Sequence, residues 1–130
     1  MVLLDSDVAI DLLRSYAPAL DWLDSLGDEE ILLPGLVIME LIQGCRNKVE
    51  QDKLEKELDR YLAVWPSTAM CKDALSTFSQ HHLSSGLGIL DALIGQTAVG
   101  LDLPLHTFNQ KHYSPISELQ TIQPYQKSPS

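Results

Sequence analysis

The sequence of 130 residues is poor in cysteine, and its two cysteines are not arranged as a functional pair. Cys45 and Cys71 lack C-x-x-C spacing, and neither has a second soft ligand nearby, which argues against a zinc site or a redox pair. A chain of this length can bury a core without covalent staples. We therefore expect two buried free thiols in a protein of the reducing cytoplasm.

Long apolar segments are also absent. The longest apolar stretch, residues 31–42, is interrupted by a Pro-Gly pair and by Glu40, and it is shorter than the roughly 20 residues that span a bilayer. The apolar start at residues 1–4 stops at Asp5, so no signal peptide is expected. These features predict a soluble protein without a membrane partner.

Positive charge is scarce, because 9 Lys and Arg residues face 18 Asp and Glu residues, giving a net charge of −9. A protein that coats nucleic acid through its phosphates would be basic, so that class is excluded. An enzyme that meets phosphates through bound cations is still compatible with this charge.

The composition is otherwise that of a globular protein, with 45% hydrophobic and 21% charged residues. We expect a single domain over residues 1–125 and a flexible polar tail over 126–130. Hydrophobic patterning predicts strands at residues 1–4, 31–33, 63–65, 103–107 and within 116–122. It predicts helices at 7–13, 18–26, 36–45, 48–61, 68–82 and 89–99, with a turn or short helix at 108–113.

Strands that alternate with helices predict an α/β fold with a parallel sheet covered by helices on both faces. Ligands of such sheets bind beyond the carboxyl ends of the strands. The residues that follow the predicted strands are therefore the first candidates for a functional site.

Most of the 18 acids lie in charged, solvated stretches, but three stand in apolar segments. Asp5 follows the first strand, Glu40 lies inside the segment 36–42, and Asp91 lies near the start of the helix at 89–99. Each has a structural alternative. Asp5 fits a helix N-cap, Glu40 a partly exposed helical glutamate, and Asp91 a first-turn acid favoured by the helix dipole.

The three acids are more informative together than singly. Carboxylates of like charge repel one another unless a cation neutralises them. Hard oxygen ligands select magnesium or manganese, and no cysteine–histidine set indicates zinc. The adjacent pair His81 and His82 lacks the spacing of helical metal ligands and is interpreted as surface.

Four segments in this order resemble the PIN domain family and, within it, the VapC-type toxins of bacterial toxin–antitoxin pairs. They are residues 1–13, 39–44, 89–98 and 105–113. The resemblance implies a PIN-like three-layer α/β/α fold around a central, mainly parallel sheet of four to five strands. It also implies that Asp5, Glu40 and Asp91 are catalytic residues that hold Mg²⁺ or Mn²⁺.

Asn109 departs from the family, because many PIN domains carry a fourth aspartate near this position. The resemblance places Asn109 among the catalytic residues, but as a neutral oxygen ligand at best, so it implies one firm metal position and a conditional second. Thr107 is a candidate to orient Asp5 or to bind phosphate, and Asp7 is a candidate cap or water-mediated ligand. Lys111 is either a contact to the RNA backbone or a solvated lysine.

The implied activity is that of a metal-dependent endoribonuclease toxin, which cleaves RNA with a metal-activated water and leaves 5′-phosphate and 3′-hydroxyl ends. The implied partners are the RNA substrate, a cognate VapB-type antitoxin and a second copy of the chain in a homodimer.

Two other interpretations are kept. A haloacid-dehalogenase-type phosphatase would use Asp5 as a covalent nucleophile within its Asp-x-Asp pair, but Val8 and Ala9 stand where threonine or glycine is usual. A non-catalytic PIN-like binding module would explain Asn109 but has no need of three acids in apolar segments.

Overall fold

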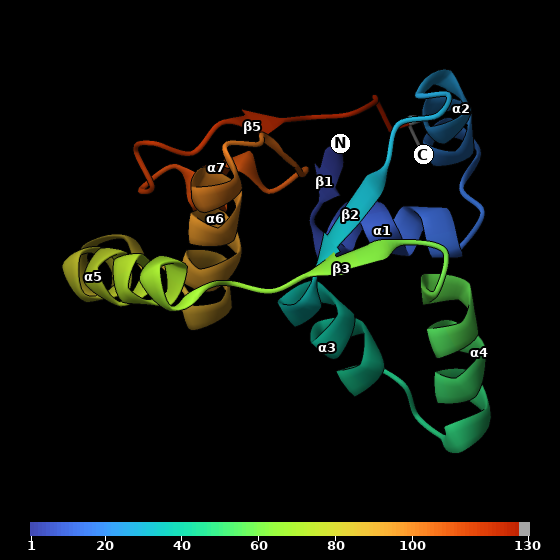
Figure 1. Cartoon of the computed structure of the whole chain (residues 1–130), viewed down its shortest axis with the longest axis horizontal. Coiled ribbons are helices and arrows are strands. Elements are labelled where there is room, and N and C mark those ends of the chain that lie inside the picture. The colour runs from blue at the N-terminus through green and yellow to red at the C-terminus, as the bar shows by residue number, and fades with distance from the viewer. Residues whose placement is uncertain (128–130) are drawn as a thin grey trace.

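The computed structural model describes residues 1–127 as a five-stranded sheet with helices around it (Figure 1). The strands are β1 (Val2–Leu4), β2 (Ile31–Pro34), β3 (Leu62–Val64), β4 (Leu105–His106) and β5 (Thr121–Ile122). The helices are α1 (Ser6–Leu13), α2 (Ala17–Ser25), α3 (Gly35–Gln43), α4 (Lys48–Leu58), α5 (Thr68–Ser85), α6 (Ile89–Leu101) and α7 (Gln110–Tyr113).

The sheet is parallel throughout and has the strand order β3-β2-β1-β4-β5. The central strand β1 is buried at every residue, as expected where helices cover both faces of a parallel sheet. It pairs with β2 through Leu3 and Leu32 and with β4 through Leu3 and Leu105, and all three leucines are at most 2% exposed. This leucine core fixes the carboxyl ends of β1 and β4 side by side.

The helices form two groups in the view of Figure 1, with α5, α6 and α7 on the left and α1, α2 and α4 on the right of the sheet. α5 packs along α6, and α3 contacts both α1 and α6. The predicted parallel α/β sheet is therefore confirmed, with five strands.

Several element boundaries differ from the sequence prediction. The helix predicted to reach residue 61 ends at Leu58, and β3 starts at Leu62. The predicted helix was too long because leucines recur every four residues at 54, 58 and 62, across the end of the helix and into the strand. The helix predicted to end at residue 82 continues to Ser85. It stops at Gly86, whose φ of +71° is a left-handed conformation that glycine adopts without strain.

The prediction that both cysteines are buried is wrong. Both thiols are free, but Cys45 is half-buried and Cys71 is exposed on α5. Of the residues on α5, only Ala74 is buried, because this long helix presents one narrow face to α6 and leaves the rest to solvent.

The C-terminal segment contacts the body of the protein as far as it is described. Lys127 pairs with Asp11 at 3.2 Å and lies over the ring of Phe108, 4.5 Å from its centroid. Of the tail predicted over 126–130, residues 128–130 lie outside the described residues. None of the described helices is both long enough and apolar enough to cross a membrane.

Candidate metal centre

Asp5 lies at the carboxyl end of β1 and also caps α1. Its Oδ1 accepts a hydrogen bond from the Ser6 N–H at 2.8 Å, and the residue is only 3% exposed. Of the caps that the sequence offered, Asp5 and Asp7, it is Asp5 that caps α1, because the helix starts one residue after it. Capping occupies one carboxylate oxygen, so it does not exclude a further role for Asp5.

Thr107 holds the second oxygen of Asp5. Its hydroxyl donates to Asp5 Oδ2 at 2.9 Å and is wholly buried. The parallel pairing of β1 with β4 brings residues 102 positions apart into this contact. Asn109 is exposed and joins the arrangement through its backbone, because its N–H donates to Thr107 Oγ1 at 3.0 Å.

Asp7 ties the first turn of α1 to the turn after β4. Its Oδ2 accepts from the Phe108 N–H at 2.8 Å, and its Oδ1 accepts from the Val8 N–H at 2.8 Å. Burial raises the pKa of Asp7, and the charge of Asp5 raises it further. With its oxygens engaged by two backbone N–H groups, Asp7 serves to position this corner of the fold.

Glu40 on α3 and Asp91 on α6 lie within the electrostatic reach of Asp5. Burial is the largest cause of the raised pKa of Glu40, and the charges of Asp5 and Asp91 raise it further. Burial also raises the pKa of Asp5, with a further contribution from Asp91. Burial raises the pKa of Asp91, while the charge of His112 lowers it. Three chain segments thus bring the three predicted acids into one mutually repelling group.

No lysine or arginine within residues 1–127 forms an ion pair with any of these three carboxylates. Buried carboxylates without a cation are costly. Over the same residues, no three His, Cys, Asp or Glu side chains are grouped closely enough to hold a metal ion. The acids therefore share one electrostatic environment without meeting at a single point.

Tyr113 is the functional candidate that the sequence analysis missed. Its side chain is 2% exposed, and its hydroxyl lies within hydrogen-bonding reach of Asp5 and Asp91, which lowers the pKa of both carboxyls. Burial and the surrounding acids raise its pKa far above the usual value, so the phenol remains a donor. A buried tyrosine needs a hydrogen-bond partner for its hydroxyl. The tyrosine in the segment 105–113 was therefore the signal from which this role could have been predicted.

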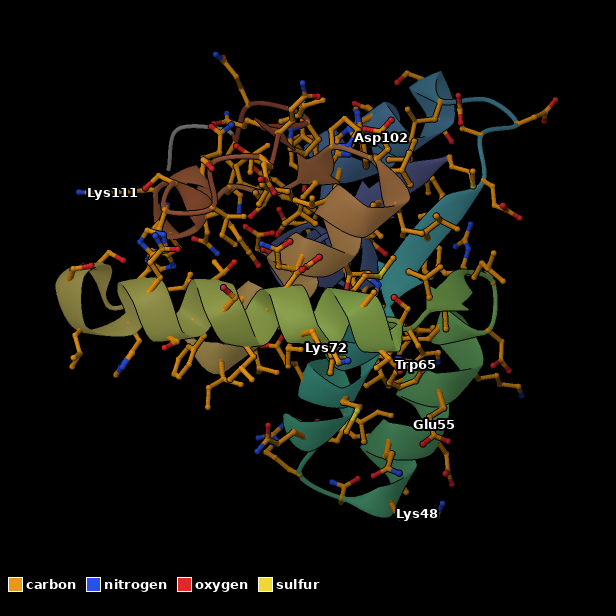
Figure 2. The ribbon with its side chains drawn as sticks, turned by 60° about the vertical axis from the view of Figure 1, so that its left-hand side comes forward. Lys48, Glu55, Trp65, Lys72, Asp102 and Lys111 are labelled. Carbon is orange, nitrogen blue, oxygen red and sulfur yellow. The ribbon has the colours of Figure 1, made fainter. Side chains whose placement is uncertain are left out.

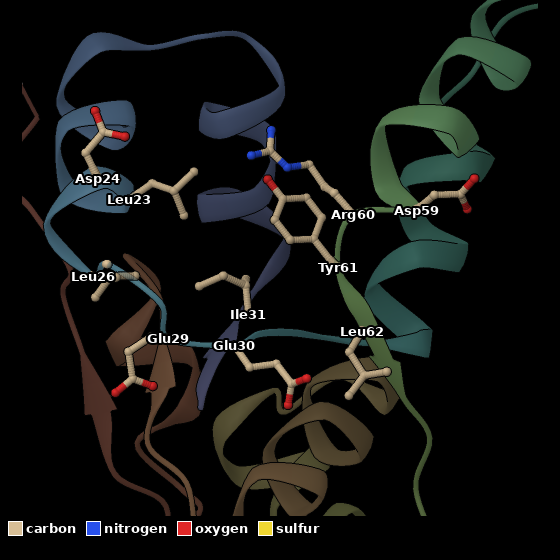
Figure 3. A pocket seen from close by; sticks show the side chains of 11 residues that line it. Leu23, Asp24, Leu26, Glu29, Glu30, Ile31, Asp59, Arg60, Tyr61 and Leu62 are labelled. Atoms are coloured by element: carbon tan, nitrogen blue, oxygen red, sulfur yellow. The ribbon is translucent and has the colours of Figure 1, made fainter.

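Two cavities lie at different distances from this group of acids. A cleft of about 540 Å³ includes Asp91 in its lining, between the α5–α6 turn and α7. Another, of about 560 Å³, includes Ile31 and Leu62 at the amino ends of β2 and β3, at the far end of the strands from Asp5 (Figure 3). The lining of this second cavity carries four acids, Asp24, Glu29, Glu30 and Asp59, and one cation, Arg60.

Comparison with known proteins by sequence gives one family. The PIN domain family model matches residues 2–115. Ribonuclease VapC10 of Mycobacterium tuberculosis is 35% identical over 128 residues, a match that covers 92% of this chain and 91% of that protein.

Solved structures share the fold over nearly the whole chain. A toxin–antitoxin complex from Klebsiella pneumoniae has a TM-score of 0.76 at 20% identity and covers 98% of this chain and 100% of the matched chain. VapBC2 from Rickettsia felis, bound to a DNA fragment from its promoter, has a TM-score of 0.75 at 22% identity and covers 94% and 98%. The fold around the acids is therefore shared with toxin–antitoxin proteins.

Proposed function

The chain belongs to the PIN domain family, and we propose that it is an endoribonuclease that acts as the toxin of a toxin–antitoxin pair. The observation that carries this proposal is the likeness to Ribonuclease VapC10, which spans more than nine-tenths of both chains. The group of Asp5, Glu40 and Asp91 beyond the central strand is the acidic site that such an enzyme would use.

The donor set fits a hard divalent cation. Carboxylate oxygens are the ligands that Mg²⁺ and Mn²⁺ take, and the three acids lack a protein cation to neutralise them. We infer that Asp5, Glu40 and Asp91 hold one such ion once their side chains, which do not meet at a single point in this structure, turn toward it. Asn109 would add at most a neutral oxygen ligand. We therefore propose one firm metal position, and a second only on condition that this weaker ligand suffices.

A bound divalent cation supplies polarisation of the phosphodiester and a lower pKa for its bound water. The chain's own residues contribute positioning. Thr107 and the Ser6 N–H fix the two oxygens of Asp5, and the Tyr113 hydroxyl fixes Asp91 relative to Asp5. Groups held in this way lose little freedom when the substrate arrives.

We also propose a VapB-type antitoxin and a homodimer as partners. The structural neighbours include VapBC proteins, which supports an antitoxin. Large apolar side chains stand exposed on α3, α5 and the start of α6, namely Met39, Leu75, Leu83 and Ile89. Exposed apolar side chains are the usual material of protein interfaces.

Cleavage of RNA by the purified chain, free of any antitoxin, tests the proposed activity. We expect cleavage of mixed single-stranded RNA in Mg²⁺ or Mn²⁺ and none after chelation. Asp5→Asn and Asp91→Asn keep the side-chain size, and each should lower the rate by about 100-fold or more, because each removes a charged ligand. Asp21→Asn, at an exposed position on α2, is the matched control.

Two outcomes would contradict the proposal. Undiminished cleavage by both site variants would show that Asp5 and Asp91 take no part in the reaction. Failure of the antitoxin-free wild type to cut any RNA would favour a non-catalytic binding module.

A further inference from the structure

The cleft of about 540 Å³ beside Asp91 has walls from two elements. Ser85, Gly86 and Gly88 form the wall at the α5–α6 turn, and Lys111 and His112 form the wall on α7. Since Asp91 belongs both to this cleft and to the acidic group, the cleft is continuous with the candidate metal centre.

The α7 wall carries positive charge that no described acid pairs. Lys111 is exposed and forms no ion pair with any residue of 1–127, a property it shares with Lys72, but it is the one lysine or arginine of these residues that lines the cleft beside Asp91. Figure 2 shows Lys111 reaching outward from the molecule. The neighbouring His112 lines the same wall of the cleft. An unpaired cation next to a metal centre is where a polyanion would be held.

The opposite wall leaves room for a backbone to approach. A Cβ placed on Gly88 would lie 3.5 Å from Oδ2 of Asp91, so any longer side chain would enter the space in front of this acid. A Cβ on Gly86 would meet nothing within 4 Å. Glycines that leave such space let a phosphate backbone come close to the chain.

The charge of the rest of the molecule favours this cleft for RNA. The net charge is −9, and the lining of the cavity at the far end of the strands carries four acids and one cation (Figure 3). A phosphate strand is repelled there and is attracted where Lys111 stands unpaired.

We infer that the cleft between the α5–α6 turn and α7 binds the single-stranded RNA next to the phosphodiester that is cut, with Lys111 contacting its backbone. The inference rests on the proposed ribonuclease activity and adds the path of the strand to it. Lys111 is here a substrate-binding residue and lies outside the acidic group that holds the cation.

Steady-state cleavage of a mixed-sequence single-stranded RNA by Lys111→Gln tests the inference. We expect KM to rise about three- to ten-fold with little change in kcat, because a backbone contact is lost that the ground state and transition state share. The slope of log kcat/KM against log salt should become shallower by about 0.7, the value for one phosphate contact on a single strand. Lys72→Gln, an exposed lysine on α5 without an ion pair among the described residues, is the matched control.

A second measurement locates the strand without relying on turnover. RNA that carries 4-thiouridine is cross-linked to the chain, and the modified peptides are identified by mass spectrometry. We expect cross-links in residues 85–88 and 111–115. Cross-links confined to other surfaces, or equal KM and salt slope in Lys111→Gln and Lys72→Gln, would overturn the inference while cleavage itself persists. Absence of wild-type cleavage would instead overturn the proposed activity.

Discussion

The phenol of Tyr113 links two acids that belong to different strands and helices. Its hydroxyl lies within hydrogen-bonding reach of both Asp5 and Asp91, and its ring is buried. A neutral phenol has one proton to donate, so it relieves two buried carboxylates only in part. The remaining demand for positive charge supports the proposal that this group of acids binds a cation.

Tyr113→Phe should destabilise the metal-free protein by about 1–3 kcal/mol, because buried carboxylates lose a donor. Added Mn²⁺ should narrow the difference from wild type, since the cation supplies the missing partner. Thermal unfolding with and without Mn²⁺ measures both effects.

Tyr125→Phe is the matched control for that comparison. The Tyr125 hydroxyl donates to Asp11 at 2.8 Å, and Asp11 is already paired with Lys127. The destabilisation caused by Tyr125→Phe should therefore be the same with and without Mn²⁺. If Mn²⁺ leaves the Tyr113→Phe deficit unchanged, or offsets both deficits equally, Tyr113 does not share the acids with a cation.

At the scale of elements, the junction of β1 with β4 determines where Asp5 and Thr107 meet. His106, the last residue of β4, donates from Nδ1 to the Leu3 carbonyl at 3.2 Å and packs against Trp22. Burial lowers the pKa of His106 below 6.5. The junction is therefore sensitive to protonation of this ring.

The sign of the pH dependence follows from that lowered pKa. As pH falls below 6.5, the unfolded chain takes up the proton before the folded chain does, so the free energy of unfolding declines until the folded pKa is passed. Melting temperatures of the wild type between pH 7.5 and 5 should fall more steeply than those of His106→Asn. Parallel curves for the two proteins would contradict this account.

Helix α6, which carries Asp91, contains two glycines with different neighbours. A Cβ on Gly95 would collide with the buried Ile116 and lie 3.6 Å from Cδ1 of Tyr113, whereas a Cβ on Gly100 would meet the side chain of Met70. Gly95→Ala should lower the free energy of unfolding by about 1–3 kcal/mol through overpacking.

Gly100→Ala should be neutral or should stabilise by up to about 1 kcal/mol, because Met70 can move and alanine favours helices. Chemical denaturation of the two variants measures the contrast. Equal losses at both positions would show that the packing of α6 against residues 113–119 has no special role.

Much of the element pattern was predictable from the sequence. Short apolar runs separated by helical periodicity predict a parallel sheet, and the residue after the first run, Asp5, then falls at the carboxyl edge. The hydrogen bonds of Thr107 and Tyr113 were harder to foresee, because they depend on which strands become neighbours. Cys71 was misjudged because its periodicity does not reveal that α5 packs mainly against α6.

For the molecule as a whole, the site explains how a protein with an excess of negative charge can act on RNA. A chain with net charge −9 repels RNA over most of its surface. We propose that it admits RNA where a cation lies among Asp5, Glu40 and Asp91 and where Lys111 is unpaired. Similarity to Ribonuclease VapC10 over nearly the whole chain supports the activity, while the cation remains the central proposal.

Titration of Mn²⁺ into the purified chain, followed by calorimetry, tests that proposal most directly. The account predicts one firm binding site in the wild type, and its loss or a weakening of about 10- to 100-fold in each of Asp5→Asn, Glu40→Gln and Asp91→Asn. Asp21→Asn should bind as the wild type does. Unchanged Mn²⁺ affinity in the three acid variants would contradict the account.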